Sequence, residues 1–187
     1  GLIDDDTVAL SNLQRQIQFD TPDIGAPKVA VSVRRLTALN PHVDVQTFAE
    51  RLTEDSAASR LAGWDLVIDG TDDFDTRMAV NGACVASGIP LVSGALGAWS
   101  GQVGVFEGRP CYRCLVPEVP PDAETCARVG VVGALAGLVG SMAALEAIKR
   151  VTGAGQPLTG RLWIHDALAG RSRTVTVTAD PTCPVCG

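Results

Sequence analysis

The chain has 187 residues, a hydrophobic content of 46% and a formal net charge of −6. That length suits one domain of ordinary size, large enough for a substantial core. The negative charge argues against nucleic acid as the main partner, because phosphate backbones are bound by basic surfaces.

The first half of the chain alternates between strand and helix patterns. In order, the predicted elements are a strand end at 1–4, a helix from Pro27 to Asn40-Pro41, a strand over 43–47, a short helix over 54–62 and a buried strand over 65–69. Such alternation is typical of a Rossmann-like α/β fold, a mostly parallel sheet with helices on both faces.

The second half predicts further strands that pair antiparallel. The predicted elements are a helix over 71–87, strands over 89–94 and 101–106, an irregular Pro-rich loop over 115–125, a long helix of small residues, and a hairpin over 160–178 that turns near Ala169-Gly170. Residues 1–187 are therefore expected to form a single α/β domain whose parallel sheet is extended by antiparallel strands.

The uncharged stretch 129–145 is similar to a membrane span. Its 17 residues would reach about 25 Å as a helix, less than the ~30 Å hydrocarbon core of a bilayer. It holds four glycines, and Glu146 and Lys149 follow directly. We expect a buried helix of a soluble domain and no membrane partner.

Cysteine spacing is the strongest local signal. Cys111 and Cys114 form one C-x-x-C pair, and Cys183 and Cys186 form another. Four thiolates in two such pairs suit a tetrahedral, structural zinc site that joins distant parts of the chain. The alternatives are two independent redox dithiols or chance spacing. No signal-peptide pattern opens the chain, so these thiols are expected in a reducing cytoplasm.

Acidic residues follow two predicted strands. Asp4 comes at the end of the first strand, where doubly wound sheets bind ligands and an acid commonly accepts from ribose hydroxyls. Alone, the run from Asp4 to Asp6 would be a solvated charge cluster. Asp72 follows a later strand in the same way, and two such acids suit one nucleotide, one for the sugar and one for magnesium. Arg15 and Lys28 offer positive charge for phosphate.

Several long motifs resemble one family in their sequence and order. They are "DDDTVALSNLQRQ", "GAPKV", "LNPHV", "DGTDDFDTRMAVN", "PLVSGALGAWSGQVGVF", "PCYRCL" and "CPVCG". Together they resemble the ThiF/MoeB/HesA family, the bacterial relatives of ubiquitin-activating enzymes. The resemblance covers essentially the whole chain. It implies ATP- and magnesium-dependent adenylation of the C-terminal glycine of a small ubiquitin-like sulfur carrier ending in Gly-Gly.

The resemblance also implies roles for particular residues. Asp4 would hold the ribose, Lys28 a phosphate, and Asp72 with Asp73 the nucleotide and magnesium. The ATP-contacting stretch would be Ser11, Asn12, Leu13, Gln14 and Arg15. The four paired cysteines match the family's zinc ligands, and a homodimer is expected. Catalysis would rest on Arg15, Lys28 and Asp72, because the attacking carboxylate is already ionised and requires positioning and charge neutralisation rather than a base.

Cys126 precedes the long helix, where the helix N-terminus and Arg128 could lower its pKa. Some family members link a cysteine at this place to the carrier. Two interpretations stay open here, a reactive thiol and a small residue at a helix start. Cys84 is predicted to be a core residue, and Arg77 and Asn81, one helical turn apart, are predicted to support the site.

The chain departs from the family pattern at its beginning. The Gly-rich phosphate loop and the N-terminal helix expected ahead of Asp4 are not in this sequence, and Asp73 stands where the family usually has Asn. The rival hypotheses are a zinc-stabilised scaffold that binds a ubiquitin-like partner without catalysis, and a nicotinamide-dependent dehydrogenase. Within the family, "LSNLQRQ" and "GQVGVF" favour molybdopterin biosynthesis over the thiazole counterpart.

Overall fold

The computed structural model describes residues 1–118 and 130–187, which divide into two compact units, Gly1–Leu52 and Thr53–Gly187. Each unit is described by itself. Cys126 and Arg128 lie outside the described residues, so the two interpretations of Cys126 remain as the sequence left them.

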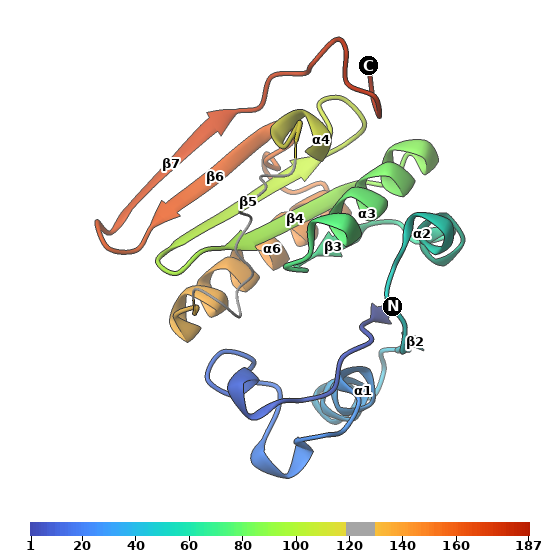
Figure 1. Ribbon diagram of the computed structural model, residues 1–187, viewed down its shortest axis with the longest axis vertical. Helices are drawn as coiled ribbons and strands as arrows, with labels where there is room; N and C mark the ends of the chain where they lie inside the picture. Colours follow the sequence, from blue (N-terminus) through green and yellow to red (C-terminus); the bar gives the residue numbers. More distant parts are fainter. Residues whose placement is uncertain (119–129) are drawn as a thin grey trace. The chain divides into compact units, whose positions relative to one another are not determined.

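The first unit is built around a short parallel pair of strands and one helix (Figure 1). Strand β1 (Leu2–Ile3) pairs with β2 (Thr47–Phe48), and α1 (Lys28–Leu39) packs against β2. Two 3₁₀ turns, η1 (Leu10–Asn12) and η2 (Thr21–Asp23), lie between β1 and α1. The strand predicted over 43–47 is therefore shorter and begins only at its last residue.

A small apolar cluster holds this unit together. Val8, Phe19 and Val31 are buried, and Leu13 packs against them. Leu13 and Phe19 thus anchor the polar segment between them, as an alternation of polar and apolar residues predicts. The apolar residues of this polar segment, Leu13, Ile17 and Phe19, predict three anchors to the core, and the prediction is wrong for Ile17, whose side chain is 93% exposed.

The second unit contains a five-stranded sheet in the order β3-β4-β5-β6-β7. The strands are β3 (Val67–Asp69), β4 (Leu91–Leu96), β5 (Ser100–Phe106), β6 (Arg161–Asp166) and β7 (Arg171–Thr176). Only β3 and β4 pair in parallel, and the other pairs are antiparallel. The α/β class with added antiparallel strands is confirmed, but among the named strands of the described residues only β1–β2 and β3–β4 pair in parallel. The turns after β4 and β6 are too short for a parallel crossover, so β5 and β7 can pair with the preceding strands only in antiparallel orientation.

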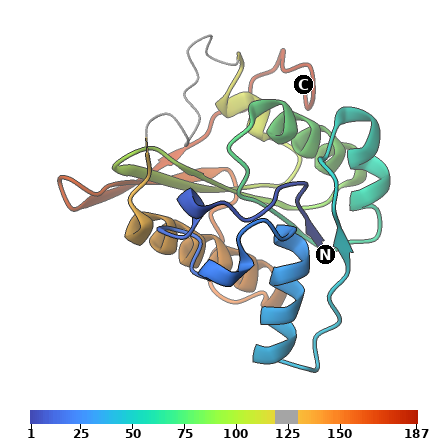
Figure 2. The ribbon, with the colours of Figure 1, turned by 60° about the horizontal axis from the view of Figure 1, so that its bottom comes forward.

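Helices cover both faces of this sheet, as predicted. The helices are α2 (Glu54–Leu61), α3 (Phe74–Ser87), α4 (Tyr112–Leu115) and α6 (Gly133–Thr152). Figure 2 shows α3 and α6 on opposite sides of the strands. Helix α3 is well delimited, because the Asp73 carboxylate accepts from Thr76 N and Gly88 ends the helix at φ 67°.

The main core lies between the sheet and α6. Side chains alternate along each strand, so Val92 of β4 and Val103 of β5 point to the face where Leu135 and Val139 of α6 pack. The opposite face carries Ser93, which meets α3 instead. The sheet therefore places apolar side chains under α6 and a polar side chain under α3.

The helix expected to be buried, α6, is buried along one face only. Leu135, Val139 and Ala143 line the buried face, whereas Leu145 and Ile148 are more than half exposed. Among the described residues, no helix combines the length and apolar character needed to cross a membrane.

Candidate functional site

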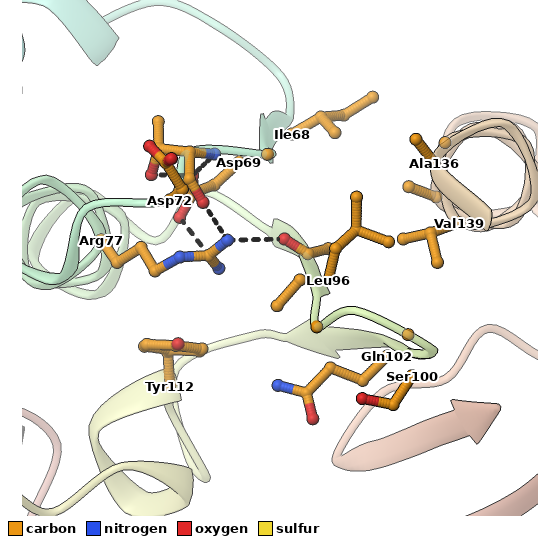
Figure 3. A pocket seen from close by; sticks show the side chains of 18 of the residues that line it. Ile68, Asp69, Asp72, Arg77, Leu96, Ser100, Gln102, Tyr112, Ala136 and Val139 are labelled. Atoms are coloured by element: carbon orange, nitrogen blue, oxygen red, sulfur yellow. Dashed lines mark hydrogen bonds and ion pairs between the residues drawn. The ribbon is translucent and has the colours of Figure 1, made fainter. Parts of the chain in front are cut away.

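A pocket of about 580 Å³ opens in the second unit where β3 and β4 end (Figure 3). Its polar wall comes from the turn after β3 and from the start of α3, and its apolar wall comes from the β4–β5 region and α6. The residues that define it best are Asp69, Thr71, Asp72, Arg77, Gly94, Gln102, Tyr112 and Val139. Carboxyl ends of neighbouring parallel strands are the usual ligand site of open α/β sheets.

Arg77 joins the two strand ends at the back of this pocket. Its guanidinium donates to Ser93 Oγ at 3.0 Å, to Gly94 O at 2.7 Å and to the carbonyl of Thr71. Its Nη1 lies 3.9 Å from Asp69 Oδ2, and both side chains are almost fully buried. A buried ion pair is retained only when its remaining polar atoms are satisfied. Here the acceptors at the ends of β3 and β4 satisfy the remaining N–H groups of the Arg77 guanidinium.

Asp69 fixes the turn that follows β3. Its Oδ1 accepts from Thr71 N at 2.9 Å and from Thr71 Oγ1 at 2.8 Å. This Asx-type arrangement holds the chain so that Asp72, one residue later, lies exposed in the pocket lining. Asp72 is thus an exposed carboxylate in the pocket lining beside a buried Asp69–Arg77 pair, and its role toward a nucleotide or magnesium stays a prediction.

Asp73 has a local structural role. Its Oδ2 accepts from the Thr76 amide at 3.0 Å and from the Thr76 hydroxyl, which caps the N-terminus of α3. The cap stabilises the helix by roughly 1 kcal/mol. Its role toward a nucleotide stays a prediction from the family resemblance.

The first unit carries the other acidic and basic candidates. Lys28 at the start of α1 is 7% exposed, and its Nζ donates to Asp6 Oδ2 at 2.6 Å and lies 3.9 Å from Asp4 Oδ2. Asp4 Oδ1 accepts from the Asp6 amide at 2.8 Å. Partial burial raises the pKa of Asp4, and the Asp6 amide and Lys28 only partly oppose that effect. The structure therefore brings Asp4 and Lys28 together.

The segment from Ser11 to Arg15 forms a compact turn rather than a helix that presents one polar face. Asn12 Oδ1 accepts from the Ala9 amide at 3.1 Å, and Arg15 Nη1 donates to Ser11 O at 2.9 Å. Ser11 and Gln14 are exposed, and Leu13 packs into the small core. The polar side chains partly stabilise the turn, and their contacts to ATP stay predictions.

The four predicted metal ligands converge in the second unit. Figure 1 shows the C-terminal tail returning beside α4. The Sγ atoms of Cys111, Cys114, Cys183 and Cys186 all lie within 4.8 Å of one another. Cys111 and Cys183 are 3.8 Å apart, and Cys114 and Cys186 are 3.4 Å apart. A tetrahedral zinc with Zn–S bonds of about 2.3 Å requires sulfur separations of about 3.8 Å, so the set fits zinc.

Neighbouring groups support this cluster as a metal site. Asn81 Nδ2 donates to Cys111 Sγ at 3.6 Å, and the Asp180 amide donates to Cys114 Sγ at 3.5 Å. Burial opposes ionisation of Cys183, but amide hydrogen bonds from Val185 and Cys186 lower its pKa to about 7. Burial raises the pKa of Cys111 and raises that of Cys186 to about 12, so among these three thiols the neighbouring donors favour the thiolate form at Cys183 alone.

Among the described residues of the second unit, the one cysteine outside the cluster has a different environment. Cys84 is 3% exposed on α3, and burial together with the charge of Asp69 raises the pKa of its thiol to about 12. Such a thiol is inert, which confirms the prediction that Cys84 belongs to the core.

Two residues matter more than sequence reasoning indicated. Arg77 was predicted to be only supporting, yet it connects four groups around the pocket. Tyr112 was not singled out, although it lines the pocket and stands between two cysteines of a C-x-x-C pair. An aromatic residue inside a metal-binding turn was the available signal.

Known proteins of one family match this chain along essentially its whole length. A family profile described as the ThiF family matches residues 1–185. The sulfur carrier protein adenylyltransferase of Thermus thermophilus is 46% identical over 196 residues, covering 100% of this chain and 72% of the relative. The molybdopterin-synthase adenylyltransferase of Escherichia coli and the sulfur carrier protein ThiS adenylyltransferase of the same species are each 41% identical over 189 residues, and this chain spans 76% and 75% of their lengths.

Solved structures show the same fold. The crystal structure of E. coli MccB with MccA-N7isoASN superposes with a TM-score of 0.85 at 19% identity. The match covers 100% of this chain and 59% of that one, so the chain spans less than two thirds of MccB. At this identity the likeness establishes the α/β Rossmann-like fold.

Proposed function

The chain belongs to the ThiF family, and from that membership we propose that it uses ATP to adenylate the C-terminal glycine of a small ubiquitin-like sulfur-carrier protein. The observation that carries this proposal is the pocket at the ends of β3 and β4, with Asp72 exposed in its lining beside the buried Asp69–Arg77 pair. The relatives named as adenylyltransferases, matched along the whole chain, support the same reaction class.

The reaction joins two anions. The carrier's terminal carboxylate attacks the α-phosphorus of ATP, and the bond between the α-phosphorus and the bridging oxygen to the β-phosphate breaks. Pyrophosphate is the leaving group, and the acyl-adenylate is the product. The carboxylate needs no general base because it is ionised at neutral pH. The protein must align the two reactants and neutralise charge that gathers on the phosphates.

Each candidate residue has a role that follows from its surroundings. Asp72, exposed in the pocket lining, would hold magnesium, which supplies positive charge to the phosphates when bound. Lys28 and Arg15 would neutralise phosphate, and Asp4 would accept from ribose hydroxyls. Lys28 already contacts the carboxylate oxygens of Asp6 and Asp4, which supports a role toward an anionic ligand.

The pocket composition suits a slender peptide tail. Gly94, Gly97, Gly101 and Gly140 line it together with Val139, and glycines keep its walls close to the backbone. We propose that a Gly-Gly terminus enters here, because an extended chain without side chains fits between such walls.

The four reduced thiols of the cluster suit the reducing environment of the cytoplasm. We also expect the protein to form a homodimer, and light scattering would measure its oligomeric state.

ATP–pyrophosphate exchange tests the proposal directly. The full-length protein should catalyse exchange only when a Gly-Gly-ending carrier is present, and Arg15→Ala should reduce the exchange rate at least tenfold. No exchange with any carrier would leave the zinc-stabilised scaffold as the better account. Exchange that does not need the carrier would mean that the protein adenylates a different carboxylate.

Two sulfur-carrier pathways are candidates for the carrier itself. We propose molybdopterin biosynthesis on the motifs "LSNLQRQ" and "GQVGVF". The thiazole counterpart has its own support, because the relatives named for the two carriers are equally identical to this chain at 41%. Exchange assays with each carrier in turn would separate them by the ratio of kcat/KM.

A further inference from the structure

The four-cysteine cluster and the pocket share one continuous set of buried side chains in the second unit. Helix α3 presents Arg77 and Asn81 one turn apart. Asn81, 1% exposed, donates to Cys111 Sγ at 3.6 Å and accepts from the Tyr112 amide at 2.8 Å. Asn81 therefore holds the first metal-binding turn at two adjacent residues.

Tyr112 continues from that turn into the pocket. Its ring is 3% exposed, lines the pocket, and lies with its centroid 5.8 Å from the Arg77 guanidinium carbon. Figure 3 shows the ring beside the Arg77 side chain. Phe106 packs edge-on against it at 5.8 Å and 89°. The ring is thus confined on one side by the core and on another by a cation, which attracts its π face.

Arg77 then reaches the loop that carries Asp72. Its contacts to the Thr71 carbonyl and to Gly94 O hold the ends of β3 and β4 together. The order of contacts is cluster, Tyr112, Arg77, Thr71, and every side chain between the cluster and the loop is buried. Tyr112 follows Cys111 directly in the chain, so a rearrangement at Cys111 moves Tyr112. The Tyr112 ring contacts the Arg77 guanidinium, so this movement changes the position of Arg77.

We propose that Tyr112 is a positioning residue that couples the four-cysteine cluster to the pocket, so that metal binding at the cluster orders the Thr71–Asp72 loop. This goes beyond a purely local role for the metal at the C-terminus. By linkage, any ligand that orders the loop also tightens metal binding by the same factor. The proposal depends on a metal-filled cluster and is independent of adenylation.

The Thr71 amide reports directly on the loop, because it donates to Asp69 Oδ1. Amide hydrogen exchange would be followed by NMR, without nucleotide, in the zinc-loaded full-length protein and after a chelator has removed the metal. In the wild type, exchange at Thr71 should become at least tenfold faster on metal removal. The Val103 amide, in the central strand β5, serves as the measure of global opening and should change less than threefold.

Two substitutions separate the ring from its hydroxyl. Tyr112→Phe keeps the π face over Arg77 and should behave as the wild type. Tyr112→Leu keeps apolar volume but loses the π face, so Thr71 should exchange fast even with zinc bound and should respond little to its removal. Zinc content should remain the same in all three proteins, since no cysteine changes.

Three results would overturn the coupling. One is unchanged Thr71 exchange after metal removal from the wild type. Another is slow, metal-responsive exchange in Tyr112→Leu. The third is an equal acceleration at Val103, which would mean that the metal supports the whole unit. The wild-type arm decides the matter even if Tyr112→Leu fails to fold, and a failure of adenylation would neither produce nor hide the effect.

Discussion

Lys28 Nζ donates to Asp6 Oδ2 at 2.6 Å while the Asp4 carboxylate lies 3.9 Å away. The lysine is buried, whereas the Asp6 side chain is more than half exposed. The ammonium therefore loses much of its hydration and depends on carboxylate oxygens. A phosphate group carries more charge and would compete with Asp6 for the same donor.

Lys28→Gln and Asp6→Asn break the same ion pair and should differ in function. Lys28→Gln should raise the Kd for ATP at least tenfold, about 1.4 kcal/mol, because it removes the group proposed to bind phosphate. Asp6→Asn should change that Kd less than threefold. Isothermal titration of both variants makes the comparison. Equal losses would mean that the pair matters only for local structure.

Asp72→Asn should strongly reduce activity while leaving the fold intact. Asp72 lines the pocket as an exposed carboxylate, so its loss removes the proposed magnesium ligand without leaving a cavity in the core. We expect the kcat of pyrophosphate exchange to fall at least 100-fold, with partial recovery at high magnesium. Asp75→Asn is the matched control, an exposed acid on the first turn of α3 outside the pocket lining, and its rate should stay within twofold.

Asp4→Asn should make the protein slightly more stable at neutral pH and weaken ATP binding. Partial burial raises the pKa of Asp4, so the folded state binds its proton more tightly than the unfolded state does. Protonated Asp4 therefore contributes to the stability of the folded state. This contribution is complete below the ordinary pKa of 3.8 and is lost as the pH rises through the raised pKa of the folded state. At pH 7 the asparagine variant should gain less than about 1 kcal/mol, since the group is partly exposed.

Chemical denaturation at several pH values checks this prediction. The gain of Asp4→Asn over the wild type should shrink as the pH falls below the raised pKa and vanish below 3.8. A gain that is the same at every pH would assign the effect to something other than the ionisation of Asp4.

The sequence predicted those features that depend on local pattern. A helix was predicted over 71–87, which matches α3 (Phe74–Ser87) at its end and begins three residues early, and C-x-x-C spacing indicated a metal cluster whose sulfurs do converge. Asp72 was predicted to lie at a strand end, and it lines the pocket there. Each of these follows from residues close together in the chain, or from chemistry that leaves few alternatives.

Features that depend on packing between distant residues were missed. Ile17 belongs to an apolar pattern but is 93% exposed, because the small core is already filled by Val8, Phe19 and Val31. Glu146 follows a long apolar stretch, yet it is fully buried, accepts from the Leu158 amide at 2.7 Å and pairs with Lys149. No local pattern indicates that a backbone amide twelve residues later will meet a carboxylate.

Replacing one cysteine of the cluster should remove the metal and destabilise the second unit. Cys186→Ser leaves three thiolates, which hold zinc less tightly. We expect zinc content to fall from one per chain toward zero, and the free energy of unfolding to drop by about 2–5 kcal/mol. Cys84→Ala, a buried cysteine outside the cluster, should keep its zinc. Elemental analysis would measure the zinc content, and chemical denaturation would measure the free energy of unfolding. Full zinc retention in Cys186→Ser would contradict the four-ligand assignment.

Gly101→Ala tests how closely α6 lies on the sheet beside the pocket. A Cβ on Gly101 would overlap Val139 Cγ2 and lie 3.5 Å from Leu135 Cδ1, both in the buried face of α6. The helix must shift or the side chains must leave their rotamers, which costs about 1–3 kcal/mol.

Gly137→Ala is the matched control for Gly101→Ala. Gly137 lies within α6 with open space around its Cα, so alanine there should be neutral or stabilise the protein by up to about 1 kcal/mol through helix propensity. Thermal denaturation should therefore show a lower Tm for Gly101→Ala and an unchanged or higher Tm for Gly137→Ala. Because Gly101 and Val139 both line the pocket, Gly101→Ala should also weaken binding of a Gly-Gly peptide, whereas Gly137→Ala should not. A Gly101→Ala protein as stable as the wild type would show that α6 can move away from the strands.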